Sequence, residues 1–158
     1  MKFEQKALIA APKDRVWAFL MDVPVMAQCI PGVTSVEPLG DDQYRGTLKV
    51  RVGPISLSLQ GDVTIVTRDE AAGIATMTAE AADKRVGGAV KASMQMVLAE
   101  STGATSATEL HVTTDAQVMG RLGEFGQSMI RKRADSIMQE FAENLRRKLE
   151  VGQQEASV

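Results

Sequence analysis

The sequence has 158 residues, with 18 lysine and arginine residues against 20 aspartate and glutamate residues, and a formal net charge of −2. This length favours a single domain. The absence of a basic excess and the presence of only six aromatic residues argue against nucleic acid as a partner. One cysteine, Cys29, excludes an internal disulfide and fits a reducing compartment. The charged N-terminus and the lack of an apolar run of about 18 residues predict a cytoplasmic protein.

Short elements are expected at the start of the chain. The alternation over Lys2 to Ile9 predicts a strand. The segment Lys13 to Met21 predicts a helix, with Pro12 placed at its first turn, where a missing N–H is not needed. A second short helix is expected over Val25 to Cys29, and Ile30-Pro31-Gly32 predicts a turn.

The middle of the chain has a period of two, which is typical of strands with one buried face. Short turns between consecutive strands predict an antiparallel meander. Six strands are expected, over Thr34–Leu39, Gln43–Val52, Ile55–Ile65, Ile74–Ala82, Val90–Leu98 and Glu109–Val118.

The last long segment, Gly120 to Leu149, has apolar residues spaced by three and four, which predicts one amphipathic helix about 45 Å long. Gly120, Gly123 and Gly126 share one side of this helix. Either they leave space for something that fills it, or the helix begins near Glu124 and the glycines form a linker.

The sequence therefore predicts an α+β fold in which a curved, seven-stranded antiparallel sheet surrounds a long C-terminal helix, with two short helices after the first strand. Residues 1–150 are expected to form this single domain, and residues 151–158 a frayed tail.

A cavity between the sheet and the helix is expected because two inward strand faces are built from alanine and methionine. Met77, Ala79, Ala92, Met94 and Met96 stand on these faces. An empty space of about 300 Å³ would cost roughly 7 kcal/mol, against a total stability of about 5–15 kcal/mol. The space is then either filled by an apolar guest or collapsed around flexible methionines.

Few residues favour catalysis. His111, the only histidine, is predicted on the polar face of its strand, and no set of side chains has the spacing of a metal site. Cys29 is interpreted as a small buried hydrophobe. No catalytic and no metal-binding residue is predicted.

Arg133 falls within the apolar stripe of the long helix. It either reaches a polar partner inside the protein or extends to solvent with its stem buried. The basic clusters are Arg131-Lys132-Arg133 and Arg146-Arg147-Lys148. Either they are solvated side chains of the helix, or they form a surface that binds anionic lipid headgroups or an acidic protein.

Several motifs resemble a known family. Ile9-Ala10-Ala11-Pro12 followed by Val16-Trp17-Ala18-Phe19-Leu20-Met21-Asp22 resembles the opening of the START-like helix-grip superfamily, also called SRPBCC. Within that superfamily, the CoxG family of carbon monoxide dehydrogenase is similar in five further segments: Cys29-Ile30-Pro31-Gly32-Val33, Tyr44-Arg45-Gly46, Val52-Gly53-Pro54, Val86-Gly87-Gly88-Ala89 and Gly120-Arg121-Leu122-Gly123-Glu124-Phe125-Gly126.

This resemblance implies a hydrophobic cavity closed by the C-terminal helix. It also implies an accessory role beside a molybdenum hydroxylase, such as aerobic carbon monoxide dehydrogenase, and a link between that enzyme and respiratory quinone at the inner face of the cytoplasmic membrane. The expected ligand is a lipid or quinone, and no covalently held cofactor is expected.

Three functions remain open at this point: a non-enzymatic carrier of an apolar ligand, an adaptor that docks a hydroxylase through its basic helix surface, and a cyclase or hydrolase. The last requires polar groups such as His111, Asp115 and Gln117 to point inward. The predicted ligand-binding residues are Met77, Ala79, Ala92, Met94, Met96, Val118, Gly123, Phe125, Gly126, Met129, Arg133 and Ile137. The predicted pocket mouth is Ile30, Pro31, Val86 and Gly87, and the predicted partner or membrane surface is Arg131, Lys132, Arg146 and Arg147.

Overall fold

The computed structural model describes residues 1–101 and 106–156, with side chains up to residue 150. The elements are β1 (Lys2–Ile9), α1 (Lys13–Met21), α2 (Val23–Met26), the 3-10 turn η1 (Ala27–Cys29), β2 (Val33–Gly40), β3 (Gln43–Val52), β4 (Ile55–Asp69), β5 (Ile74–Asp83), β6 (Gly88–Glu100), β7 (Thr108–Gly120), the 3-10 turn η2 (Arg121–Glu124) and α3 (Gln127–Ala156).

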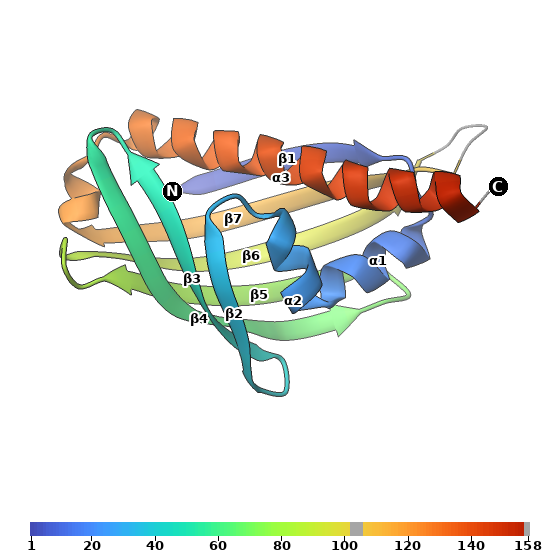
Figure 1. Ribbon diagram of the computed structural model, residues 1–158, viewed down its shortest axis with the longest axis horizontal. Coiled ribbons are helices and arrows are strands. Elements are labelled where there is room, and N and C mark those ends of the chain that lie inside the picture. Colours follow the sequence, from blue (N-terminus) through green and yellow to red (C-terminus); the bar gives the residue numbers. More distant parts are fainter. Residues whose placement is uncertain (102–105, 157–158) are drawn as a thin grey trace.

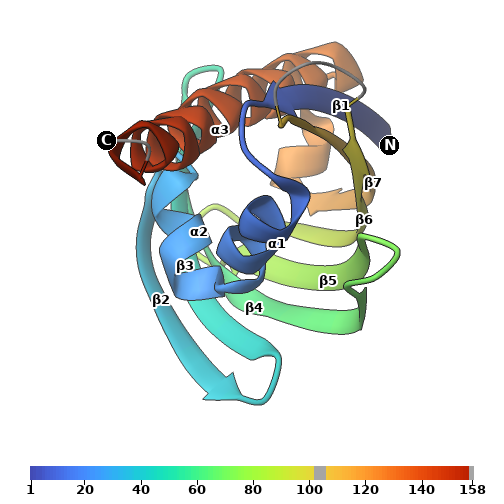
Figure 2. The ribbon, with the colours of Figure 1, turned by 90° about the vertical axis from the view of Figure 1, so that its right-hand side faces the viewer.

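The strands form one seven-stranded sheet in the order β1-β7-β6-β5-β4-β3-β2. Every neighbouring pair is antiparallel, and β2 to β7 follow one another as a meander before β1 adds to β7. The helix α3 lies across the concave side of this sheet (Figure 1), and the end-on view shows the sheet curling beneath it (Figure 2). The predicted helix-grip architecture is confirmed.

Two glycines face each other across β3 and β4. Gly46 on β3 pairs with Gly61 on β4, and Gly61 pairs in turn with Ala81 on β5. A Cβ added to Gly61 would collide with the carbonyl oxygen of Glu80, so the strands approach closely here because a side chain is missing.

The short helices close one end of the curved sheet. Val16, Trp17 and Leu20 of α1 are buried, on the face that the sequence pattern predicts. They pack with Ile9 and Leu145 in the same core cluster. The predicted second helix is a four-residue α2 followed by η1, and Cys29 at the end of η1 is 1% exposed.

The long helix begins seven residues later than its apolar pattern predicts. Gly120 has φ 70° and ψ −149°, a conformation that only glycine adopts readily, and the chain turns there from β7 into η2. Phe125 is extended, and α3 starts at Gln127. The glycine segment is therefore a linker. At its other end α3 remains helical to Ala156, six residues beyond the predicted domain end.

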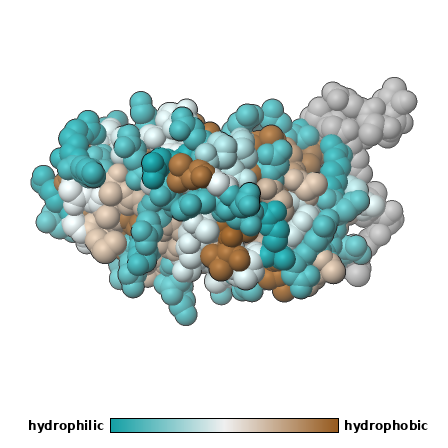
Figure 3. All heavy atoms as spheres, turned by 90° about the horizontal axis from the view of Figure 1, so that it is seen from below, coloured by the Kyte–Doolittle hydropathy of each residue, from teal (hydrophilic) through white to brown (hydrophobic). Residues whose placement is uncertain are grey.

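The helix α3 packs unequally along its length. Phe141, Ala142, Leu145 and Leu149 are buried, whereas Ile130, Ala134, Ile137 and Met138 are only half-buried. The C-terminal half thus anchors the helix in the core, and the N-terminal half covers space that side chains do not fill. The face of the molecule in Figure 3 is largely hydrophilic, with small and separate hydrophobic patches.

Candidate functional site

The larger apolar space beneath α3 is called here the aliphatic chamber. Its volume is about 270 Å³. Its walls come from the inward faces of five strands, from η2 and from α3, and almost all of the lining is carbon. The lining residues are Phe3, Gln5, Leu48, Val50, Val52, Leu57, Leu59, Val90, Ala92, Thr114, Ala116, Val118, Leu122, Ile130, Arg133, Ala134, Ile137 and Met138.

A second apolar space, called here the methionine chamber, lies nearer α1 and α2 and has a volume of about 150 Å³. Five methionines, one each from α2, β5 and α3 and two from β6, account for much of its wall. The lining residues are Leu20, Met26, Ile30, Met77, Met94, Met96, Leu110, Val112, Ile137, Met138 and Phe141.

The two chambers share Ile137 and Met138 of α3 as their dividing wall. Both side chains are half-buried. Methionine is unbranched and changes rotamer at low cost. A shift of Met138 would therefore join the two chambers along the length of α3.

Among the described residues, Arg133 is the one charged residue in the walls of the chambers. Its Nε is buried and has no hydrogen-bond partner among the described residues. Its Nη1 lies 3.4 Å from Ser136 Oγ. A buried donor without a partner is costly, so this nitrogen calls for an acceptor. Arg133 therefore borders the aliphatic chamber, while its Nη1 contacts Ser136 at the surface and not a partner inside the protein.

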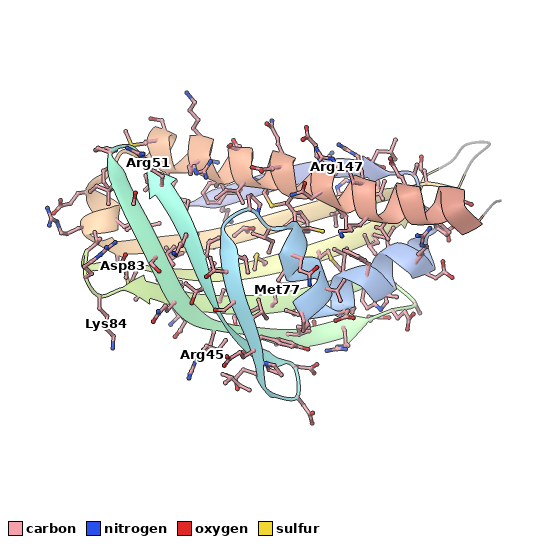
Figure 4. The ribbon with its side chains drawn as sticks, viewed as in Figure 1. Arg45, Arg51, Met77, Asp83, Lys84 and Arg147 are labelled. Atoms are coloured by element: carbon pink, nitrogen blue, oxygen red, sulfur yellow. The ribbon has the colours of Figure 1, made fainter. Side chains whose placement is uncertain are left out.

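Outside Arg133 lies a surface groove, called here the basic groove. Its lining includes Lys49, Arg51, Arg85 and Arg133, and it shares Val50, Leu57 and Arg133 with the aliphatic chamber. No carboxylate from residues 1–101 or 106–150 lines it. Figure 4 shows Arg51 at the end of the molecule where α3 begins, with Asp83 and Lys84 at the same end.

Asp83 holds the loop between β5 and β6 at this end of the sheet through hydrogen bonds to its backbone. Its carboxylate is 4% exposed and accepts hydrogen bonds from the backbone N–H of Ser58 at 2.8 Å, Arg85 at 3.0 Å and Val86 at 3.2 Å. These bonds, with that from Ser58 the largest cause, hold the pKa of Asp83 below its usual value. The ionised carboxylate therefore fixes the loop that carries Arg85.

On the opposite side, α3 is tied to β1. Arg131 Nη1 donates to the carbonyl oxygen of Lys2 at 2.7 Å, and Arg146 Nε donates to that of Leu8 at 2.9 Å. Gln5 Nε2 donates to Asp135 Oδ1 at 3.0 Å. Two of these bonds satisfy carbonyls on the outer edge of β1, which is an edge strand of the described sheet.

A polar crevice runs between β1 and α3 beside these bonds. It shares Leu110, Val112, Met138 and Phe141 with the methionine chamber. The charged residues in its lining are Glu4, Lys6, Asp135, Glu143 and Arg146. The interior thus borders two surface depressions, one with mixed charge and one whose charged lining residues are basic.

Of the predicted ligand-binding residues, some line one of the two chambers and five line neither. Met77, Met94, Met96 and Ile137 line the methionine chamber, and Ala92, Val118, Arg133 and Ile137 line the aliphatic chamber. Ala79, Gly123, Phe125, Gly126 and Met129 line neither. Phe125 packs against the core cluster of Val52, which consists of Val52, Leu57, Leu59 and Leu122. Met129 lies over Gly53.

The predicted mouth residues do not all border the same chamber. Ile30 lines the methionine chamber, whereas Pro31, Val86 and Gly87 line neither. Val86 packs against the core cluster of Val52, and the carbonyl oxygen of Gly87 accepts the backbone N–H of Arg121. Within the predicted surface set, Arg131 and Arg146 are bonded to β1, while Lys132 and Arg147 are exposed.

Sequence reasoning missed the contribution of β3 and β4 to the aliphatic chamber. Leu48, Val50, Leu57 and Leu59 alternate with polar residues, and this signal predicts their strands but does not tell which residues approach α3. Met138 was also missed, although it lies in the apolar stripe of the long helix.

The three polar residues of β7 that could support catalysis line neither chamber. His111 Nε2 lies 3.4 Å from Glu109 Oε1, and Asp115 lies 4.0 Å from the N-terminal amine. Gln117 is exposed. These side chains do not converge inside the protein. Burial raises the pKa of the Cys29 thiol, and in the part of the chain that the structure describes no three potential ligands are grouped to hold a metal ion.

The profile of the carbon monoxide dehydrogenase G-subunit family (CoxG) matches residues 6–150 of this chain. The chain belongs to this family. CoxG proteins are usually accessory proteins without catalytic activity, on a fold that typically binds hydrophobic ligands. No curated protein matches the sequence. Among the described residues, none of the helices is long and apolar enough to cross a membrane.

Solved structures show the same fold for this CoxG chain. A conserved protein from Geobacillus kaustophilus superposes with a TM-score of 0.84 at 19% identity, covering 94% of this chain and 95% of that one. A START superfamily protein from Mycobacterium smegmatis gives 0.69 at 14% identity, with 94% and 97% covered. The ZhuI aromatase/cyclase from Streptomyces gives 0.61 at 18% identity, with 95% and 93% covered. These identities establish the START-like fold alone.

Proposed function

We propose that this CoxG-family protein is a non-enzymatic carrier of an apolar ligand, specifically a lipid of the respiratory quinone type. It serves as an accessory to a molybdenum hydroxylase such as aerobic carbon monoxide dehydrogenase, in the cytoplasm and in peripheral contact with the membrane. The observation that carries this proposal is the pair of carbon-lined chambers beneath α3. Family membership supports the association with carbon monoxide dehydrogenase.

The energetics of the chambers favour an occupant. Together their volumes, about 270 Å³ and about 150 Å³, reach the lower part of the range for ligand sites. An unfilled space of 270 Å³ alone corresponds to a loss of about 6 kcal/mol. A prenyl chain that fills the chambers along α3 would recover much of this loss by dispersion and burial.

Native mass spectrometry of the purified protein, followed by solvent extraction, tests the proposal. We expect a bound species that extracts as an isoprenoid quinone, and saturable binding when the delipidated protein is titrated with a short-chain quinone. Protein that carries only its own mass and binds no quinone would contradict the carrier function.

An adaptor function is favoured by a separate observation, the exposure of Lys132 and Arg147. Charge reversal at these two positions leaves the bonds of Arg131 and Arg146 to β1 intact. If docking uses this surface, the double variant Lys132→Glu/Arg147→Glu loses capture of the hydroxylase and keeps its lipid content. Unchanged capture would exclude docking through this surface.

A further inference from the structure

We infer that the aliphatic chamber takes a single-chain amphiphile with an anionic head, a carboxylate or phosphate, which lies at Arg133 and in the basic groove while the chain extends beneath α3. This inference rests on the proposed function, since it needs the chambers to hold an apolar chain. It goes beyond it by assigning a second class of occupant, whose head is anionic where the ring of a quinone is neutral, and the direction in which that ligand lies.

The first support is the unsatisfied Nε of Arg133. Inside a carbon-lined wall this nitrogen has no acceptor among the described residues, and its Nη1 contact to Ser136 is long at 3.4 Å. A guanidinium presents its donors in a planar fork that matches a carboxylate or a phosphate. An anionic oxygen at Nε would remove the cost of the unpaired donor.

The second support is the set of charges around Arg133. Lys49, Arg51 and Arg85 line the same groove, and its described lining contains no carboxylate. Asp83, an acid close to Arg85 at 3.7 Å, is already occupied by three backbone N–H groups. The groove therefore keeps a positive excess, although the whole chain has a net charge of −2.

The third support is the contrast with the other depression. The crevice between β1 and α3 is lined by Glu4, Asp135 and Glu143 as well as Lys6 and Arg146, and the Gln5–Asp135 hydrogen bond bridges its two sides. An anionic head is repelled by these carboxylates and attracted by the basic groove. The charges thus set the polarity of the bound chain, with its tail directed past Ile137 to the methionine chamber.

Matched probes that differ only in the head test this inference. Delipidated protein is loaded with Nile red, a neutral apolar dye, which is then displaced below micelle-forming concentrations by tetradecanoate, tetradecyl phosphate, tetradecan-1-ol or tetradecyltrimethylammonium. We expect both anions to displace the dye at concentrations roughly 10- to 100-fold lower than the alcohol, and the cation to be weakest. Inorganic phosphate and acetate, which lack a chain, should not displace it.

Variants locate the head. Arg133→Gln should remove the preference for anions and leave the alcohol unchanged, and Arg133→Lys should restore part of that preference. Arg147→Gln, on the outward side of α3 (Figure 4), is the matched control and should behave as the parent protein. Thermal unfolding establishes that each variant is folded.

The outcomes separate the two proposals. Equal displacement by the acid and the alcohol, or an anion preference that survives Arg133→Gln, overturns the inference and leaves the carrier function standing. Failure of Nile red and of every amphiphile to bind overturns the carrier function. Displacement by inorganic phosphate alone would overturn the inference by reducing the site to an anion site without a chain.

Discussion

Thr108 illustrates how one hydroxyl joins two distant parts of this chain. Its side chain is fully buried, and its Oγ1 donates to the carbonyl oxygen of Ala11 at 2.8 Å, where the chain passes from β1 to α1. The bond fixes the start of α1 against the beginning of β7. Removing the hydroxyl would leave a buried carbonyl unsatisfied, which costs more than the bond itself contributes.

We therefore expect Thr108→Val to lower the free energy of unfolding by about 1–3 kcal/mol. Thr113→Val on the same strand is the control, because Thr113 is exposed and its replacement should change stability by less than about 0.5 kcal/mol. Urea denaturation followed by circular dichroism measures both. Equal losses in the free energy of unfolding would show that the Thr108–Ala11 bond contributes no more to stability than an exposed hydroxyl does.

Asp83 should make stability depend on pH. Because its pKa is lower in the folded protein than in the unfolded chain, its contribution is present above the unfolded value, about 3.9, and disappears as the pH falls through the folded value. Asp83→Asn should thus be less stable than the parent protein at pH 7, and the deficit should shrink at about pH 3. Denaturant unfolding at both pH values checks this, and a deficit that is the same at both would contradict it.

At the scale of elements, the junction between β7 and α3 shows what a residue pattern cannot specify. The apolar spacing indicates a helix, and it extends back to Leu122 without interruption. The structure breaks this pattern at Phe125, which is extended between η2 and α3, and such a local change of ψ leaves no trace in periodicity. The regular strands were predictable to within a few residues because alternation and turn residues coincide there, as at Gln43–Val52.

The glycines at this junction should respond differently to alanine. In Gly120→Ala, the new Cβ would meet the carbonyl oxygen of Gly87 and the backbone would be strained, so we expect a loss of about 1–3 kcal/mol or more. In Gly126→Ala, nothing among the described residues lies near the new methyl group, and we expect stability to be unchanged or up to about 1 kcal/mol higher. Thermal unfolding of the two variants measures the contrast, and similar losses would contradict it.

At the scale of the whole molecule, the sequence predicted a cavity from alanine and methionine faces, and the methionine chamber contains several of those residues. The larger, aliphatic chamber is lined in part by β3 and β4, so its volume depends on how far the sheet as a whole curls toward α3. Such curvature is a property of many residues together. Single positions such as Leu57 therefore could not be assigned to the chamber from the sequence.

Filling the aliphatic chamber should affect binding and stability in opposite ways. Ala92 lines this chamber, so we expect Ala92→Leu to reduce ligand capacity while stability stays constant or rises. In a closely packed core the same change would cost about 1–3 kcal/mol. Ala99→Leu, at an exposed position of β6, is the matched control and should alter neither property. Dye titration and thermal unfolding together measure the outcome; a clear loss of stability in Ala92→Leu would show that the space is already closed.

The unequal attachment of α3 has a consequence for exchange of a guest. Hydrogen bonds join the helix to β1 through Arg131, Asp135 and Arg146. In the C-terminal half, Asn144 Nδ2 also donates to the carbonyl oxygen of Cys29 in η1 at 2.9 Å, whereas near the start of the helix Met129 lies over Gly53 in van der Waals contact. The C-terminal half of α3 is therefore held more firmly than the half that covers the aliphatic chamber. We expect the residence time of a guest to depend on how often this N-terminal half moves away from β3, so uptake and release can be fast even when the bound complex is strong.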